Sequence, residues 1–491
     1  MKYLYYKNKY SSLKNGGSDK IIDTPLILAC KNNQIDLVTE ILDRESIEIN
    51  KIDNNGKTAL FWACSFNNTE IIKLLLNKGA NINHQDNEYK TPIYYACKKN
   101  ENNLVSLLIE YRADVNIPDS DNKTPLFYIK DEELIRLLLD NGANIFHVDN
   151  ANKTPFFCAC QTDNFLLANL ILNKLILEQS KDEIREYINK KSNINETPLI
   201  YACKFVNLDL VELLLINDAD PNIVTTSITT PLSYACDSEK LELVQLLLRH
   251  GANPNIANIY YNIPLTIACI KENIPIINEL LLNGSNVNGF MECVELSSTY
   301  KTPLYFACIA RNYDIVNILL HNGADPNIYD EDGTPLTEVC KENIFAIAYL
   351  LLDKGVNGSI NVKDRENKTA LYYACKNNNL ELATKLLKNN AIVSIDESTA
   401  NTPLSWSQKH KNEELTILLH RYNNKQQREK KKELSGTKEL CETNELSKTK
   451  NTWEKINSSK TRNERNERNE RNDKTETSKT SESSSKGKKK K

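Results

Sequence analysis

The sequence has few of the features by which catalytic or membrane-spanning proteins are recognised. It contains no apolar run of 18 residues, so no membrane-spanning helix is expected, and residues 1–23 lack the apolar centre of a secretion signal. The 14 glycines form no phosphate-binding loop, and the 6 histidines form neither a paired metal-ligand spacing nor a recognisable nucleophile–histidine–acid arrangement. We therefore expect a chain that is not an enzyme and needs no cofactor or metal.

What the sequence does contain is one dipeptide that recurs at regular intervals. Thr-Pro, or a close variant, occurs twelve times, mostly about 33 residues apart, at Thr24, Thr58, Thr91, Thr124, Thr154, Thr197, Thr230, Ile263, Thr302, Thr334, Thr369 and Thr402. A period of this length is typical of supersecondary units that are too small to bury their own apolar face and therefore stack. Such a stack offers an extended surface for holding another molecule and no catalytic pocket.

Residues 57–83 show how one unit is built. Thr58 is a suitable N-cap, because its hydroxyl can accept a hydrogen bond from a backbone N–H that the helix leaves unpaired. Most units place proline next, where its missing N–H costs nothing. The apolar residues at 60–64 predict a short first helix, and those at 71–76 predict a second one. Gly79 ends the second helix, because glycine adopts the left-handed conformation at little cost.

In this chain the units read Thr-Pro-Leu-x-x-Ala-Cys, then a Leu-Leu-Leu helix, then Gly-Ala-Asn/Asp-x-Asn. This pattern resembles the ankyrin repeat. The resemblance covers residues 24–423 and implies an all-α solenoid of helix–turn–helix units with β-hairpin-like fingers. The Asn- and Lys-rich composition is similar to that of ankyrin arrays encoded by AT-rich genomes.

The chain departs from the family pattern in two ways. The histidine that usually follows Thr-Pro-Leu is absent, and Ile27, Phe61, Tyr94, Phe127 and Tyr305 are among the residues found in its place. We therefore expect aromatic packing to replace the Thr–His bonds that commonly join neighbouring ankyrin units. In ten units, cysteine also replaces the second alanine of the first helix.

Those ten positions account for most of the 13 cysteines: Cys30, Cys64, Cys97, Cys160, Cys203, Cys236, Cys269, Cys308, Cys340 and Cys375. Equivalent positions in stacked helices lie about 10 Å apart, whereas a disulfide needs Cα atoms within about 7 Å. These cysteines are therefore expected to be small buried apolar residues. Free thiols favour a reducing compartment, either the cytoplasm or nucleus, or a host cell's cytoplasm if the protein is a secreted effector.

Three units depart from the common length. The fourth is three residues short, which should compress the loop between its helices near residues 126–133. The fifth is ten residues longer, and its second helix should continue past Leu175 toward Tyr187. The eighth has six extra residues in its finger, near residues 289–293. Such insertions arise on a binding face or by neutral drift in a tolerant loop, and both explanations stay open, as does a hinge at units four and five.

The twelfth unit and the residues after it differ from the rest. Where other units have Ala-Cys, this unit has Ser407-Gln408, which predicts a polar C-terminal cap from Thr402 to about Asn424, because no further unit covers it.

Charge is divided unevenly along the chain. Residues 421–491 hold 22 lysines and arginines against 12 acidic residues, a net charge of +10, whereas residues 1–420 hold 40 against 53, a net charge of −13. We divide the chain into a polar leader (1–23), a repeat array (24–423) and a basic low-complexity tail (424–491). Because apolar residues are sparse in the tail, we expect it to be disordered.

The resemblance implies that a protein partner meets the fingers and the inner face of the first helices. Lysines precede the Thr anchor or follow the cysteine in many units, and aromatic residues lie near them. The candidate partner-binding residues are Lys57, Phe66, Tyr89, Lys90, Lys98, Lys123, Lys153, Lys204, Phe205, Lys301 and Lys368. We expect a monomeric scaffold or adaptor whose partner has an acidic surface, although lysines that are merely solvated explain the same pattern.

The basic tail supports a second hypothesis. Lysine runs bind phosphate nonspecifically or act as import signals, so the chain could instead associate with nucleic acid or chromatin. Against this, glutamate alternates with arginine in the tail, and no row of aromatic residues is present there to stack on bases.

Overall fold

The computed structural model describes residues 23–44, 47–258, 262–289, 301–356, 358–393 and 402–431, and its repeated helix–turn–helix packing confirms the expected solenoid. Most of the leader, the insertion at residues 290–300 and residues 432–491 lie outside the described residues. The chain divides into two compact parts, residues 1–368 and residues 369–491.

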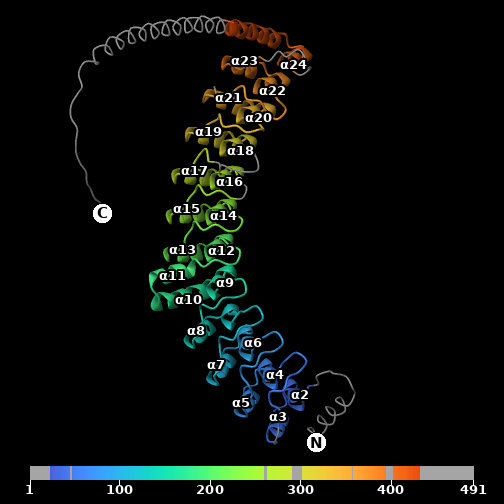
Figure 1. Ribbon diagram of the computed structural model, residues 1–491, viewed down its shortest axis with the longest axis vertical. Coiled ribbons are helices and arrows are strands. Elements are labelled where there is room, and N and C mark those ends of the chain that lie inside the picture. Colours follow the sequence, from blue (N-terminus) through green and yellow to red (C-terminus); the bar gives the residue numbers. More distant parts are fainter. Residues whose placement is uncertain are drawn as a thin grey trace, which may run out of the picture. The chain divides into compact units, whose positions relative to one another are not determined.

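The first part is built from two layers of helices (Figure 1). One layer holds the first helix of each unit: α2 (Pro25–Lys31), α4 (Ala59–Ser65), α6 (Pro92–Lys98), the 3-10 helix η1 (Pro125–Tyr128), α9 (Pro155–Gln161), α12 (Pro198–Lys204), α14 (Pro231–Asp237), α16 (Pro264–Ile270), α18 (Pro303–Ile309) and α20 (Pro335–Lys341). Consecutive members of this layer pack on each other, and the fingers extend on the same side.

The other layer holds the second helices, which pack on the outside of the first: α3 (Ile35–Leu42), α5 (Thr69–Asn77), α7 (Asn102–Glu110), α8 (Glu132–Asp140), α10 (Phe165–Glu178), α13 (Leu208–Ile216), α15 (Leu241–Arg249), α17 (Ile274–Leu282), α19 (Tyr313–His321) and α21 (Phe345–Asp353). Unit five adds α11 (Lys181–Ile188).

A continuous apolar core lies between the layers. In unit two, Leu60 and Cys64 of α4 and Ile72 and Leu75 of α5 are buried, and the corresponding residues of the other units repeat this arrangement. Burying one such aliphatic side chain contributes about 1.5–3 kcal/mol. Because each unit covers the apolar face of the next, the core is continuous within the first part.

The ends of the helices follow the expected signals, with one correction. The hydroxyl of Thr24 accepts a hydrogen bond from the N–H of Ile27 (3.2 Å), and most other anchor threonines do the same. The prediction was wrong for Thr58: it occupies the N-cap, but its buried hydroxyl has no hydrogen-bond partner. Gly79 ends α5 at φ +87°, as expected, and Arg112 adopts φ +63° at the same place in unit three.

The short fourth unit loses part of its first helix as well as its loop. Only the single 3-10 turn η1 forms, Ile129 is already extended, and the carboxylate of Asp131 then caps α8 by accepting from the N–H of Leu134 (3.0 Å). The deletion therefore shortens a helix that the repeat period had predicted in full.

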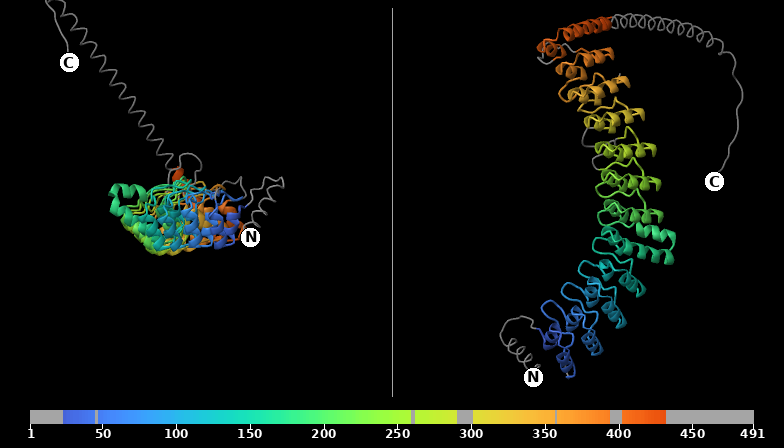
Figure 2. Two further views of the ribbon diagram at one scale, coloured as in Figure 1. Left: turned by 90° about the horizontal axis from the view of Figure 1, so that it is seen from below. Right: turned by 180° about the vertical axis from the view of Figure 1, so that it is seen from behind.

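The long fifth unit corrects a second prediction. Its second helix does not continue to Tyr187. It ends at Glu178, and α11 begins at Lys181 after Ser180 and Glu183 form a capping box. The Ser-x-x-Glu spacing that starts a new helix was visible in the sequence and was missed. Together α10 and α11 project beyond the layer of second helices (Figure 2).

The second part contains α22 (Ala370–Lys376), α23 (Leu380–Lys388), α24 (Pro403–Lys409) and helical backbone over 413–431. In the terminal unit Ser407 is buried, and its hydroxyl donates to the carbonyl of Leu404 (2.8 Å) and accepts from Thr416 (3.0 Å). The last helix runs past 423, so 424–431 are helical although the tail was expected to lack structure. Across the described ranges, no helix combines the length and the apolar character that crossing a membrane requires.

Candidate functional site

From here on, a finger is counted with the unit whose first helix follows it. The fingers among the described residues are closed by the side chain with which they begin. In unit four, one carboxylate oxygen of Asp119 accepts from the backbone N–H groups of Asp121 and Lys123, both at 3.0 Å. Asp53, Asp86 and Asp149 close their own fingers through equivalent bonds. The aspartate therefore fixes the turn, and it directs its second oxygen toward the first helix of the unit.

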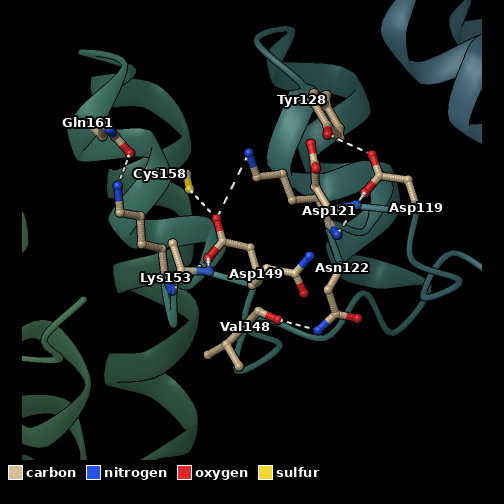
Figure 3. A network of polar contacts seen from close by, with 12 residues as sticks. Asp119, Asp121, Asn122, Tyr128, Val148, Asp149, Lys153, Cys158 and Gln161 are labelled. Carbon is tan, nitrogen blue, oxygen red and sulfur yellow. Dashed lines mark hydrogen bonds and ion pairs between the residues drawn. The ribbon is translucent and has the colours of Figure 1, made fainter. Parts of the chain in front are cut away.

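The second oxygen binds an aromatic donor on that helix. Asp53 accepts from the indole N–H of Trp62 (3.0 Å), Asp86 from the hydroxyl of Tyr95 (2.7 Å), and Asp119 from that of Tyr128 (2.7 Å). Figure 3 shows the unit-four bond beside unit five, where Cys158 replaces the aromatic residue and its sulfur lies 4.0 Å from Asp149. The finger and the helix of a unit are thus tied together by a buried carboxylate.

These contacts shift pKa values in both groups. Burial would raise the pKa of Asp53, but hydrogen bonds from the backbone of Lys57 and Asn55 and from Trp62 outweigh it and lower that pKa. Burial, followed by the bond to Asp86, raises the pKa of Tyr95. The carboxylate of Asp53 therefore stays ionised and the phenol of Tyr95 stays protonated at neutral pH.

Aromatic packing also joins neighbouring units, as predicted from the missing histidine. The ring of Phe61 lies 5.8 Å from that of Tyr95, and the ring of Tyr94 lies 5.0 Å from that of Tyr128, both edge to face. Phe157 and Tyr201 repeat the contact between units five and six at 5.6 Å. Pairs of this geometry contribute about 0.5–1.5 kcal/mol beyond the area they bury.

The lysines of the candidate face lie between these aromatic pairs. The ammonium of Lys57 is 4.4 Å from the centre of the Tyr95 ring and 3.9 Å from the carboxylate of Asp86, both in the next unit. Lys123 approaches Asp149 in the same way, at 3.9 Å. The row of cations expected from the sequence is therefore a row of alternating cations, carboxylates and rings, and much of its charge is compensated within the protein.

Most of the other lysines of the candidate face form hydrogen bonds. Lys153 donates to Gln161 (2.9 Å), Lys204 to Glu196 (2.7 Å) and Lys301 to Asp332 (3.0 Å), and Lys90 pairs with Glu88. The backbone N–H of Lys368 closes its finger by donating to Asp364. Within the described part of the face, the ammonium groups of Lys57, Lys98 and Lys123 donate no hydrogen bond, although Lys57 and Lys123 form the 3.9 Å ion pairs given above. We call these three the weakly held lysines.

Three aromatic candidates are exposed, as a binding role would need. The exposed fractions are 51% for Phe66, 60% for Tyr89 and 53% for Phe205. Phe66 and Phe205 follow first helices, whereas Tyr89 lies at the tip of a finger with φ +60°, where unit two has Gly56. A left-handed conformation costs a residue with a Cβ atom about 1–2 kcal/mol.

A repeated set of asparagine hydrogen bonds between neighbouring units, which we call the asparagine ladder, was missed in the sequence. The amide of Asn255 donates to the carbonyl of Gly284 (3.1 Å) in the next unit, and its oxygen accepts from the N–H of Asn286 (2.7 Å). The same pair of bonds is formed by Asn50, Asn116 and Asn222. The signal was the last asparagine of Gly-Ala-Asn-x-Asn, so part of the asparagine content has a structural role.

Unit ten lacks the bond between the finger aspartate and an aromatic residue of the first helix. Glu338 stands where other units have a ring, and the second oxygen of Asp330 is buried without a hydrogen-bond partner. Burial, followed by the charge of Asp332, raises the pKa of Asp330, and burial also raises that of Glu338. A hydrogen bond from Lys301 lowers the pKa of Asp332. Within the described ranges, no three His, Cys, Asp or Glu side chains are grouped so as to hold a metal ion.

Comparisons with known proteins agree with this architecture. A family model described as ankyrin repeats (3 copies) matches residues 1–86, 81–149, 129–225, 175–258, 232–330 and 323–398. Over 58 residues, 12% of this chain, the sequence is 43% identical to human neurogenic locus notch homolog protein 2, but it spans only 2% of that protein. Over 83 residues, 16% of this chain, it is 35% identical to ankyrin repeat protein C18/B24 of vaccinia virus (strain Copenhagen), and it spans 55% of that protein.

Proposed function

Because the chain belongs to the ankyrin-repeat family, whose repeats are general protein–protein interaction modules, we propose that it is a non-catalytic scaffold or adaptor. Its partner is a protein with an acidic surface, held on the finger and inner-helix face. The eleven cysteines in the described part of the chain are free and buried, which supports a reducing compartment: the cytoplasm, the nucleus, or a host cell's cytoplasm for a secreted effector. The protein acts as a monomer.

Units two to four carry the observation on which this proposal depends. The weakly held lysines all lie there, together with the exposed rings of Phe66 and Tyr89. A carboxylate of a partner can accept hydrogen bonds from these lysines without breaking an existing hydrogen bond, since Lys57 and Lys123 have only ion pairs at 3.9 Å. The two rings offer aromatic anchors of the kind that dominate interfaces.

The conformation of Tyr89 supports the same location. Its left-handed backbone costs free energy that glycine or asparagine would save, and the residue is 60% exposed, so most of its surface does not stabilise the fold by burial. Strained residues of this kind are concentrated at functional sites. Tyr89 is therefore the residue of this face on which we place most weight.

The bonded lysines have a different role. For Lys90, Lys153, Lys204 and Lys301, a partner carboxylate has to compete with an acceptor that the protein already provides. The bond of Lys301 to Asp332 crosses to the next unit, whereas the bonds of Lys90, Lys153 and Lys204 lie within their own units. Exposed neighbours of these lysines, such as Phe205, extend the contact. Lys368 belongs to the same face.

Charge reversal of the three weakly held lysines, Lys57, Lys98 and Lys123, tests the proposal. Wild type and the triple Lys→Glu variant are used to capture partners from lysate, with identification by mass spectrometry. A matched control reverses Lys73, Lys240 and Lys354 on the side of the second helices. We expect the first variant to lose specific partners that wild type and the control retain, with unchanged helix content by circular dichroism. Equal capture by all three proteins would exclude this face.

The basic C-terminal segment favours a second candidate function, association with nucleic acid or chromatin. Residues 421–491 carry a net charge of +10, of which residues 432–491 hold +6, and this charge would attract phosphate in a salt-dependent manner. Deleting residues 432–491 and measuring polynucleotide retention in rising salt tests it. Unchanged retention would exclude this candidate function without affecting the first.

A further inference from the structure

Five asparagine–glycine pairs lie among the described residues, at Asn55, Asn141, Asn283, Asn288 and Asn322. An asparagine followed by glycine is prone to deamidation, because the glycine backbone nitrogen is unhindered and can attack the side-chain amide carbon. Asparagine is among the thermally labile residues of proteins for this reason. The five pairs share the same chemistry, so differences among them come from how the structure holds each amide.

The structure holds four of these amides. Nδ2 of Asn141, Asn283 and Asn322 donates to the carbonyl four residues earlier, each at 2.8 Å. Asn288 belongs to the asparagine ladder and is held at both ends, donating to Gly323 (3.2 Å) and accepting from the N–H of Asp325 (2.8 Å). An amide held in this way must first break a hydrogen bond before its carbon can meet the backbone nitrogen.

Asn55 differs from the other four. It lies in the exposed finger of unit two, and its backbone is engaged at both ends, with its N–H bonded to Asp53 (2.9 Å) and its carbonyl bonded to the N–H of Asn87 (3.0 Å). Its side-chain amide forms no hydrogen bond within the described residues. We propose that the Asn55–Gly56 pair is a self-modification site at which the finger of unit two deamidates spontaneously.

The reaction needs only water and a weak base. The N–H of Gly56 first leaves its hydrogen bond to the carbonyl of Asp53 (3.0 Å), a step that the glycine N–H groups of the other four pairs share because each of them also donates to a backbone carbonyl. The nitrogen then loses its proton to the base and attacks Cγ of Asn55, and a C–N bond forms. The bond from Cγ to Nδ2 then breaks, the nitrogen takes up a proton and leaves as ammonia, and a five-membered succinimide remains. Water opens this ring at either carbonyl, which yields aspartate or isoaspartate. One water is consumed, one ammonia is released, and no oxidation occurs.

The product alters the junction between the fingers of units two and three. The carbonyl of Gly56 accepts from the ring of His84 (2.9 Å), and Asn87 donates its backbone and side-chain N–H groups to Asn55 and Asn54, both at 3.0 Å. Isoaspartate lengthens the backbone by one carbon inside this set of bonds. The space beside Gly56 is small, since a Cβ built there would lie 2.3 Å from the side-chain oxygen of Asn87, so the longer backbone has little room to shift toward unit three. Deamidation therefore loosens the contact between these two fingers.

Peptide mapping of the aged full-length protein tests the proposal. The purified chain is incubated at pH 8 and 37 °C, and conversion at the five sites is followed by mass spectrometry, with a parallel sample in denaturant. In the native sample Asn55 should convert at least about fivefold faster than the other four, the factor that corresponds to one hydrogen bond of about 1 kcal/mol. In denaturant the five rates should converge.

Two results would overturn the proposal. One is native conversion at any held asparagine as fast as at Asn55, and the other is an equal preference for Asn55 in denaturant, which would mean that sequence rather than structure selects the site. The matched variant Asn55→Gln should resist conversion. The amide proton of Asn87 should exchange faster in aged wild type than in aged Asn55→Gln, and equal exchange would refute the loosening of the fingers.

Discussion

The bond between a finger aspartate and the ring below it should contribute measurably to stability, and Tyr95→Phe tests it. The hydroxyl of Tyr95 is 2.7 Å from the carboxylate of Asp86, whose residue is only 6% exposed. Removing the hydroxyl leaves that oxygen with Lys57 at 3.9 Å as its remaining neighbour of opposite charge. The ring and its packing against Phe61 stay in place, so the substitution isolates the hydrogen bond.

The expected size of the effect follows from the charge of the acceptor. A hydrogen bond to a charged group contributes about 1.5–3 kcal/mol, and a buried acceptor that loses its donor bears the cost of desolvation. We therefore expect Tyr95→Phe to reduce the local free energy of unfolding by about 2 kcal/mol. This corresponds to an opening equilibrium about thirtyfold larger.

Native-state hydrogen exchange is the appropriate assay, because a solenoid does not unfold in one step and a single midpoint would average over its units. The amide protons of α6 should exchange about thirtyfold faster in the variant, while those of α18 should be unchanged. Tyr234→Phe is the matched control, since Thr225 stands at the start of that finger in place of an aspartate. If α6 exchanged less than about threefold faster, or if the control had the same effect, the carboxylate bond would not be the cause.

Further predictions concern unit ten, the asparagine ladder and the cysteines. At pH 7, Asp330→Asn should raise the free energy of unfolding by about 1 kcal/mol, because burial and Asp332 raise the pKa of Asp330 and disfavour its ionised form. This gain should disappear as the pH falls, because the wild-type carboxyl then becomes protonated. Asp332→Asn should lower the free energy of unfolding by a similar amount, because the pKa of Asp332 is lowered, and this loss should become smaller as the pH falls. Urea titrations at several pH values measure both effects and show whether they have opposite signs. Asn255→Ala should cost about 1–2 kcal/mol, because it removes two bonds to the next unit, and faster exchange at Asn286 would report the loss. The buried cysteines, such as Cys64, whose pKa burial raises to about 12, should resist iodoacetamide at pH 8 until denaturant is added, as counted by mass spectrometry.

Local signals in the sequence were sufficient for the fold. The Thr-Pro start, the Gly79 type of stop and the width of the apolar stripe each act within one unit, so a single period predicts a helix pair and twelve periods predict the stack. The errors were also local. Ser180 and Glu183 announced a new helix that the expectation of one long helix obscured, and the hydroxyl of Thr58 shows that a cap residue can occupy its position without forming its bond.

The charge of the candidate face could not be read in the same way, because it depends on contacts between units. Lys57 meets Asp86, and Lys123 meets Asp149, each across a unit boundary. Counting lysines along the chain therefore overestimates the positive potential of the face. The asparagine ladder was missed for the same reason, since its acceptors lie in the next unit.

The regular part of the face cannot by itself choose where a partner binds. A perfectly repeated array of carboxylate, ring and lysine would offer an extended partner the same contacts in every register, one unit apart. The register in which a partner binds, and which partner binds, must therefore depend on residues that break the repeat, because only these make the binding free energy at one position differ from that at the next. The first part contains such breaks: the strained and exposed Tyr89, the sulfur of Cys158 in place of a ring, and the carboxyl of Glu338 with the buried Asp330 oxygen that has no hydrogen-bond partner. Exchanging Tyr89 for glycine should therefore reduce selectivity for a partner more than removing any one regular lysine, and the ratio of affinities for wild-type and scrambled partner segments measures this difference.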